Sequence, residues 1–168
     1  MKARIFVLLT VVAATLRGAE TPAAPPEVRH FDFWVGDWEV FDRSRGFKIG
    51  DNHIELIESG RVLLERWRDV RGGTGVSISA YDAANERWQQ TWMAASGKVN
   101  NSYGGLREGA MVLTTAPSGF DRCTWTPQPD GTVRQQIEQS ADGGKSWQTM
   151  FDGVYRRKSA AATPASSP

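Results

Sequence analysis

The stretch that decides the fold covers residues 31–40 and reads FDFWVGDWEV in this 168-residue chain. It contains Gly36-Asp37-Trp38 at the start of the first strand-like run. A glycine there lets the backbone bend sharply into a strand, and the indole of Trp38 is large enough to close one end of a rolled sheet. The stretch predicts a closed β-sheet in which Gly36 and Trp38 have structural roles.

After this stretch the chain consists of short alternating runs divided by turns, with no convincing amphipathic helix. The connections are short and rich in Gly, Asp, Asn and Pro, at residues 59–60, 82–85, 96–97 and 129–131. Short connections make neighbouring strands antiparallel, and closing the sheet removes both exposed edges. We therefore predict an all-β antiparallel meander of about ten strands that closes into a barrel. The expected strands are 38–42, 48–57, 61–68, 75–81, 87–94, 98–103, 110–115, 120–126, 132–140 and 147–157.

Four motifs resemble a known group of proteins: FDFWVGDWEV, VLLERW, RWQQTW and DGGKSW. They resemble the calycin barrels, a group that includes lipocalins, fatty-acid-binding proteins and nitrobindins, and in particular the DUF1579-like and nitrobindin-like exported proteins of bacteria. The resemblance implies that Trp38 packs against a basic residue at the end of the last strand, either Arg157 or Arg156. Nitrobindins bind haem through a late histidine, and no histidine follows His53 here. We therefore expect neither haem nor another cofactor.

The two ends of the chain differ in composition from the predicted barrel, which occupies residues 29–158. Residues 1–19 carry a basic start and a short apolar run, which is typical of a signal peptide and of a periplasmic or secreted protein. Residues 20–28 are interpreted as a Pro/Ala-rich tether and residues 159–168 as a disordered tail. Removing residues 1–19 leaves 17 basic and 19 acidic residues, a net charge of −2. The sequence therefore predicts no nucleic-acid partner and no membrane span in the mature chain, and it does not determine the oligomeric state.

The residues that support common catalytic or metal chemistry are scarce. Cys123 is the only cysteine, which excludes an intramolecular disulfide and favours a buried core thiol. His30 and His53 are the only histidines, and their spacing does not match a metal site. No serine lies in a nucleophile elbow. We therefore assign no catalytic residue and no metal ligand.

Residues 140–147 read SADGGKSW and resemble the Asp-box, a motif that has a structural role in sialidases. Asp142 can accept hydrogen bonds from the amides of the turn, Gly144 provides a permissive backbone, and Trp147 can pack beneath the hairpin. We therefore predict structural roles for Asp142, Gly144 and Trp147.

The alternation of side chains along the third predicted strand indicates which of them enter the barrel. Glu65 and Trp67 share one face, while Arg66 and Arg68 share the other. Two arginines are far easier to solvate outside, so Glu65 and Trp67 are expected to point inward. A buried carboxylate without a partner costs about 1 to 3 kcal/mol or more, so Glu65 must bind other side chains, water or a ligand.

The same alternation places two amides inside the barrel. Trp92 shares its face with Gln90, and Ile137 shares its face with Gln135. In the fourth strand the inward set is either Ser77, Ser79 and Tyr81 or Val76, Ile78 and Ala80. The predicted ligand-binding residues are Glu65, Trp67, Ser79, Tyr81, Gln90, Trp92 and Gln135. We expect a solvent-reachable cavity beside Gln90 and Gln135.

These features favour an exported barrel that binds a small, partly apolar molecule, because such barrels enclose cavities and the chain lacks a catalytic template. Two alternatives remain open. In the first, the protein is an enzyme that uses Glu65 as a general acid or base. In the second, it is a structural envelope protein whose barrel packs only its own side chains.

Overall fold

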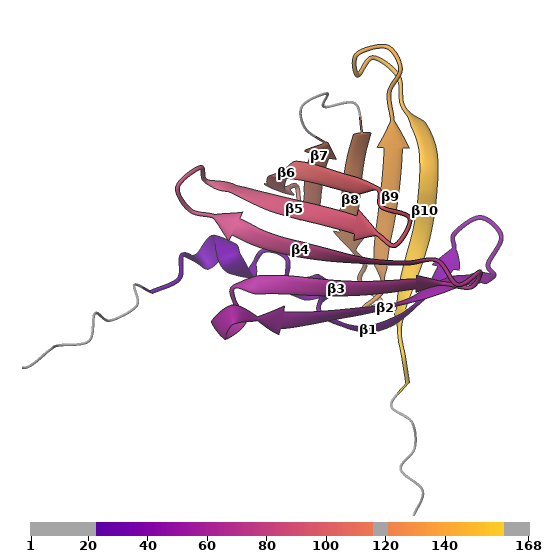
Figure 1. The fold of residues 1–168 in the computed structure, drawn as a ribbon, viewed down its shortest axis with the longest axis horizontal. Helices are drawn as coiled ribbons and strands as arrows, with labels where there is room; N and C mark the ends of the chain where they lie inside the picture. The colour runs from indigo at the N-terminus through magenta and orange to yellow at the C-terminus, as the bar shows by residue number, and fades with distance from the viewer. Residues whose placement is uncertain (1–22, 116–120, 160–168) are drawn as a thin grey trace, which may run out of the picture.

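The computed structural model describes residues 23–115 and 121–159, and it is a single closed barrel of ten antiparallel strands (Figure 1). Each strand pairs with the next along the chain, and the first pairs with the last, so the sheet has no open edge. This arrangement confirms the all-β meander predicted from the sequence. The predicted signal peptide (residues 1–19), residues 20–22 of the predicted tether and residues 160–168 of the predicted tail lie outside the described residues.

The strands follow the predicted order closely. In Figure 1 the first five run across the view, and β7 to β10 cross them at a steep angle. The bounds are β1 Gly36–Asp42, β2 Lys48–Ile57, β3 Val62–Asp69, β4 Thr74–Asp82, β5 Arg87–Ala94, β6 Val99–Arg107, β7 Ala110–Thr115, β8 Asp121–Pro127, β9 Val133–Gln139 and β10 Gln148–Arg157.

The sixth strand is longer than the sequence predicts, because it continues past residue 103 to Arg107. Gly104 lies within the strand opposite Leu113, where a Cβ atom would collide with the carbonyl oxygen of Val112. The glycine here permits a close approach of two strands rather than a turn.

The segment before the first strand closes one end of the barrel. It forms the short 3-10 helices η1 (Pro26–Arg29) and η2 (Asp32–Trp34), and a third, η3 (Glu58–Gly60), joins β2 to β3. Phe31 and Trp34 are fully buried, and the Trp88 indole donates a hydrogen bond to the Glu27 carbonyl. The folded part therefore begins by Pro26, earlier than the predicted boundary at residue 29.

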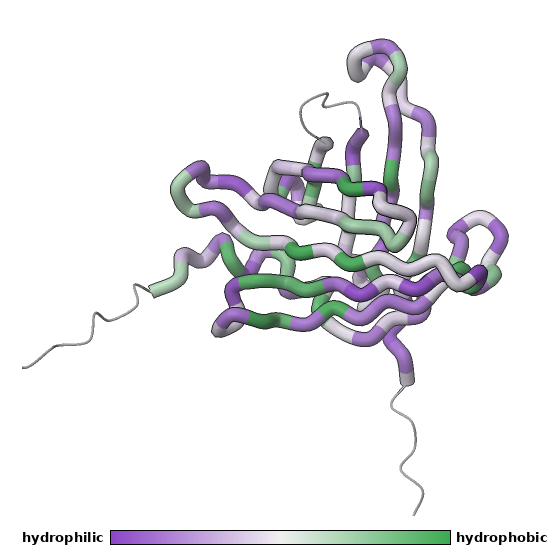
Figure 2. Tube along the Cα trace, in the orientation of Figure 1, coloured by the Kyte–Doolittle hydropathy of each residue, from purple (hydrophilic) through white to green (hydrophobic). Residues whose placement is uncertain are grey.

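Buried and more exposed side chains alternate along most strands. Hydrophilic and hydrophobic residues likewise follow one another along the strands (Figure 2). The fully buried apolar core lies around Phe31 and Trp34, and we call this end of the barrel the plugged end. The buried core consists of Phe31, Trp34, Trp38, Val40, Ile54, Leu63, Trp88, Met111, Leu113, Trp125, Val133 and Tyr155.

Trp38 and Arg157 meet where the first and last strands close the barrel. They are paired in register, and the Arg157 guanidinium lies 4.3 Å from the centre of the Trp38 ring. The indole donates a 2.9 Å hydrogen bond to the carbonyl of Trp34. Arg156, the alternative partner, lies over Phe41 instead. Trp38 thereby links the closing strands to the plug.

Candidate functional site

The end of the barrel opposite the plug is more accessible to solvent. Inward-facing side chains there are only half-buried, whereas those of the plugged end are almost fully buried. We call this end the mouth and define it by Trp67, Trp92, Ile137 and Phe151. Three of these four side chains are aromatic, so the mouth offers apolar, ring-lined contact surface.

Two glycines let the tryptophans of the mouth lie against the barrel wall. A Cβ atom at Gly50 would collide with the Trp67 ring, and one at Gly75 would collide with the Trp92 ring. Gly50 is paired in register with Asp69, two residues after Trp67, and Gly75 with Ala94, two residues after Trp92. Both glycines are buried. The rings therefore cover the wall at places where any other residue would push them toward the barrel axis.

Between the plug and the mouth, inward-facing polar side chains form a hydrogen-bonded chain that we call the polar belt. Its members come from seven strands and meet near the level of Glu65. The polar belt consists of Asn52, Glu65, Ser77, Ser79, Gln90, Cys123, Gln135 and Tyr155.

Glu65 is the acceptor at the centre of the polar belt. Asn52 Nδ2 donates to Glu65 Oε1 at 2.7 Å, and Ser77 Oγ donates to Oε2 at 2.5 Å. Gln90 Nε2 lies 3.3 Å from Ser77 Oγ and 3.2 Å from Ser79 Oγ, and it donates to both. The hydrogen bonds on this side of the polar belt therefore run from the Gln90 amide through the Ser77 hydroxyl to the Glu65 carboxylate.

The other half of the polar belt crosses to the last strands. Asn52 Nδ2 lies 3.4 Å from the Tyr155 hydroxyl, which donates to Gln135 Oε1 at 2.5 Å. Gln135 Nε2 then donates to Cys123 Sγ at 3.2 Å. Most polar atoms of the belt are satisfied, but Asn52 Oδ1 is buried and accepts no hydrogen bond from the described residues.

Burial governs the protonation of the polar belt. It raises the pKa of Glu65, an effect that the hydrogen bonds from Ser77 and Asn52 partly oppose. It also raises the pKa of the Cys123 thiol and of the Tyr155 hydroxyl. Among the described residues, Glu65 forms no ion pair with a basic side chain. Its carboxylate is therefore stabilised by neutral donors alone.

The structure places the residues predicted from strand alternation on the inner face. Glu65, Ser79, Gln90 and Gln135 lie in the polar belt, and Trp67 and Trp92 lie at the mouth. Tyr81 also faces inward but lies apart from the others, near the plugged end, with its ring centre 6.3 Å from that of Trp88.

The fourth strand, whose orientation the sequence left open, is now assigned. Ser77 and Ser79 are fully buried, while Val76 and Ile78 are exposed on the outside. Ser77, Ser79 and Tyr81 are therefore the inward set.

The sequence analysis missed Asn52, Cys123 and Tyr155 as members of the site. The alternation of Asn52 with Ile54 is a signal that could have identified the first. The contacts of Tyr155 with Asn52 and Gln135 join segments far apart in the chain. No local sequence pattern predicts such contacts.

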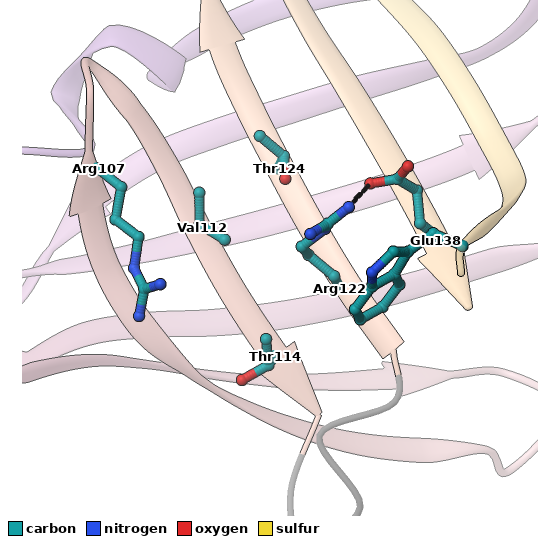
Figure 3. A pocket seen from close by; sticks show the side chains of 7 residues that line it. Arg107, Val112, Thr114, Arg122, Thr124 and Glu138 are labelled. Carbon is teal, nitrogen blue, oxygen red and sulfur yellow. Dashed lines mark hydrogen bonds and ion pairs between the residues drawn. The ribbon is translucent and has the colours of Figure 1, made fainter. Parts of the chain in front are cut away.

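Two hollows lie on the outer wall of the barrel. One, of about 350 Å³, is lined by outward side chains of β6 to β9, among them Arg107, Arg122 and Glu138 (Figure 3). The other, of about 550 Å³, lies over β3 to β5 beside Val76 and Met93, and at its edge Trp67 and Gly75 also line it. Neither is lined by Gln90 or Gln135, so the cavity expected beside these amides is not one of these two hollows and stays a prediction.

The hairpin between β9 and β10 has the contacts expected of its motif. Asp142 accepts hydrogen bonds from the backbone amides of Lys145 and Ser146 and from two serine hydroxyls. Gly144 has a φ of +87°. The Trp147 ring lies 4.1 Å from the Arg122 guanidinium, on the outer wall. The contact of Trp147 with Arg122 holds the hairpin against the outer face of β8.

Residues 23–115 and 121–159 contain no group of three or more His, Cys, Asp or Glu residues that could hold a metal ion. No helix in these ranges has the length and apolarity needed to cross a membrane. His53 instead contacts Asp37 on the surface at 2.6 Å.

The chain matches no protein-family model and no curated protein among those with which it was compared. The likeness to nitrobindin-like barrels therefore rests on the four motifs and stays a prediction.

Proposed function

We propose that this protein is an exported barrel that binds a small, partly apolar molecule at its mouth. The observation that carries the proposal is the juxtaposition of half-buried tryptophans, Trp67 and Trp92, with the polar belt directly beneath them. Aromatic surface with a few convergent polar groups is typical of small-molecule sites.

The gradient of exposure through the barrel supports this proposal. Trp34 and Trp88, at the plugged end, are 0% exposed, whereas Gln90 and Gln135 in the polar belt retain 7% and 8% exposure. A ligand entering from the mouth would meet the aromatic rings first and the polar belt last. The rings would supply apolar contact, and the belt would orient the polar end of the ligand.

Fluorescence of N-phenyl-1-naphthylamine, an apolar probe, tests the site. We expect saturable binding to the full-length protein and about tenfold weaker binding to Trp92→Ala, because tenfold corresponds to about 1.4 kcal/mol of lost contact. Met93→Ala is the matched control, since Met93 is the next residue along the strand but lines the outer hollow. Circular dichroism of both variants establishes that they are folded.

Two results would contradict the proposal. If Met93→Ala weakens binding and Trp92→Ala does not, the probe occupies the outer wall. If binding is not saturable, and native mass spectrometry of protein purified from its host finds only the mass of the chain, the barrel has no ligand site.

The proposed location rests on the sequence of residues 1–19, with Lys2 and Arg4 followed by an apolar run. Residues 1–28 fused to a reporter that is active only after export should give an active reporter. A reporter that stays inactive in the cytosol would contradict the proposal of export.

A further inference from the structure

The polar belt contains more hydrogen-bond acceptors than donors. The Glu65 carboxylate has about four lone-pair positions and receives hydrogen bonds from two neutral groups, Asn52 Nδ2 and Ser77 Oγ. Glu65 is 5% exposed and has no cationic partner among the described residues. A buried carboxylate in such surroundings is stabilised strongly by a cation.

A second acceptor lies beside this carboxylate. Asn52 is 2% exposed, and its Nδ2 atom lies within hydrogen-bond distance of both Glu65 and Tyr155. These contacts orient the amide and leave Oδ1 buried without a donor from the described residues. A buried unpaired acceptor costs about 1 to 3 kcal/mol, so an N–H group reaching this point gains from both residues.

The inward-facing charges have the same sign near the mouth. By strand register, Asp69 and Asp121 have the same parity as Glu65 but lie at the outer rim of the mouth. There Asp69 accepts hydrogen bonds from the Arg71 and Gly73 amides, and Asp121 accepts one from Gln139. Arg157 also has inward register, but it lies at the plugged end, stacked on Trp38 and bonded to the carbonyl of Val35. Carboxylates at the rim and Glu65 in the polar belt are thus of one sign, which attracts cations toward the mouth.

The aromatic rings of the mouth add to this preference. Trp67 lies beside Asn52 in the register of β2 and β3, and Trp92 lies beside Ser77 in that of β4 and β5. Tryptophan faces attract ammonium groups by about 0.5 to 2 kcal/mol. A cation passing these rings would reach the acceptors of the polar belt.

We propose that the ligand is an organic ammonium compound with a flat apolar body, whose N–H groups bind Glu65 and Asn52. This inference rests on the proposed binding function and names the ligand class for the same site. The ammonium charge balances the buried carboxylate, its N–H groups satisfy Asn52 Oδ1, and the apolar body contacts the rings of the mouth.

Isothermal titration calorimetry with three compounds that share a ring tests the inference. The compounds are 1-naphthylmethylammonium, 1-naphthalenemethanol and 1-naphthylacetate, which are cationic, neutral and anionic at neutral pH. For the full-length protein we expect the ammonium compound to bind at least about tenfold more tightly than the alcohol, a difference of about 1.4 kcal/mol. The carboxylate should bind the weakest.

Glu65→Gln isolates the contribution of the carboxylate. It should reduce ammonium binding to the level of the alcohol and leave binding of the alcohol within about twofold of wild type, by the same affinity scale. Glu55→Gln is the control, because it removes the same charge from the outer face of the adjacent strand, where Glu55 pairs with Arg66. It should leave the preference for ammonium intact.

The outcomes separate this inference from the proposed function. Equal binding of the three compounds by the wild-type protein would overturn the ammonium preference and leave the binding function standing. Loss of the preference in Glu55→Gln as well as Glu65→Gln would also overturn it, since surface charge would then be the cause. If none of the compounds binds and N-phenyl-1-naphthylamine also fails to bind, both proposals are wrong. If Glu65→Gln does not fold, the wild-type order of affinities alone decides.

Discussion

Gly36 leaves the space that the Arg157 guanidinium occupies. A Cβ atom at Gly36 would collide with Arg157 Nη1, and Gly36 has a φ of +143°, which disfavours other residues. The glycine that bends the chain into its first strand thus also admits the cation that stacks on Trp38. Gly36 therefore has two roles: it starts β1, and it leaves room for the Trp38–Arg157 contact where β1 pairs with β10.

Gly36→Ala should destabilise the fold for two reasons. Backbone strain costs about 1 to 3 kcal/mol, and displacement of the guanidinium adds a further cost of about 1 to 3 kcal/mol. In an Arg157→Ala background only the strain remains, so the substitution should cost less there. Urea denaturation of the four proteins of this double-mutant cycle measures the difference, and additive effects would exclude the steric link.

Trp38→Ala should lower the melting temperature by many degrees. The indole is fully buried and donates a hydrogen bond to Trp34, and large aromatic truncations cost about 3 to 5 kcal/mol. Phe47→Ala, which removes a ring that is 50% exposed, is the control and should change little. Similar melting curves for Trp38→Ala and wild type would remove Trp38 from this role.

Glu65→Gln should stabilise the unliganded protein more at pH 8 than at pH 4. Burial raises the pKa of Glu65 in the folded state, so above its unfolded pKa of about 4.3 the folded protein binds more protons than the unfolded chain. Stability therefore falls as the pH rises through the folded pKa. Tyr155 and Cys123, the other titratable groups of the polar belt, also have raised pKa values and remain neutral over this range.

Thermal denaturation between pH 4 and 8 measures this effect. The gain for Glu65→Gln should be several degrees at pH 8, since 1 kcal/mol corresponds to about 2 to 8 °C in domains of this size range. It should shrink toward pH 4, where wild-type Glu65 is protonated. A pH-independent difference would mean that Glu65 does not titrate differently in the folded state.

Gly75→Ala should impair ligand binding by moving Trp92. The new methyl group collides with the indole and forces the ring toward the barrel axis; we expect N-phenyl-1-naphthylamine to bind about tenfold more weakly, or about 1.4 kcal/mol. Gly105→Ala is the matched control, since a Cβ there meets no atom within 4 Å. Unchanged affinity in both variants would place the probe elsewhere.

Asp142→Ala should loosen the hairpin between β9 and β10 without affecting ligand binding. The hydrogen bond from the Ser146 side chain is the largest cause that lowers the pKa of Asp142, to about 2. The contribution of this carboxylate is thus present above the ordinary Asp pKa of about 3.9 and is lost as the pH falls toward 2. Amide hydrogen exchange of Lys145 and Ser146 should accelerate, whereas Asp130→Ala, in another turn, should leave it unchanged.

Strand alternation predicted much of the barrel and part of its interior. A strand that pairs on both sides has a fixed inner face, so the position of Arg66 was enough to place Glu65 inside. The same reasoning placed Gln90 and Gln135. In the fourth strand both faces carry small or apolar residues, and alternation therefore could not distinguish Ser77 from Val76.

The plug and the full extent of the polar belt could not be predicted in this way. Phe31 and Trp34 lie in short 3-10 turns without a period of two, and they are buried by contacts with Trp88 and Trp125. Burial there depends on the closed barrel itself. The end of β6 was placed too early, at residue 103, because a glycine that permits close strand approach, such as Gly104, has the same local signature as one that ends a strand.

The seam between β1 and β10 determines how the molecule would face a surface to which it was anchored. Because Trp38 pairs with Arg157, the first strand begins and the last strand ends at the plugged end. A linker, affinity tag or immobilisation point joined at residue 25 or residue 158, next to these folded ends, would leave the barrel from that side. The mouth would then face away from the support, open to molecules that diffuse toward it.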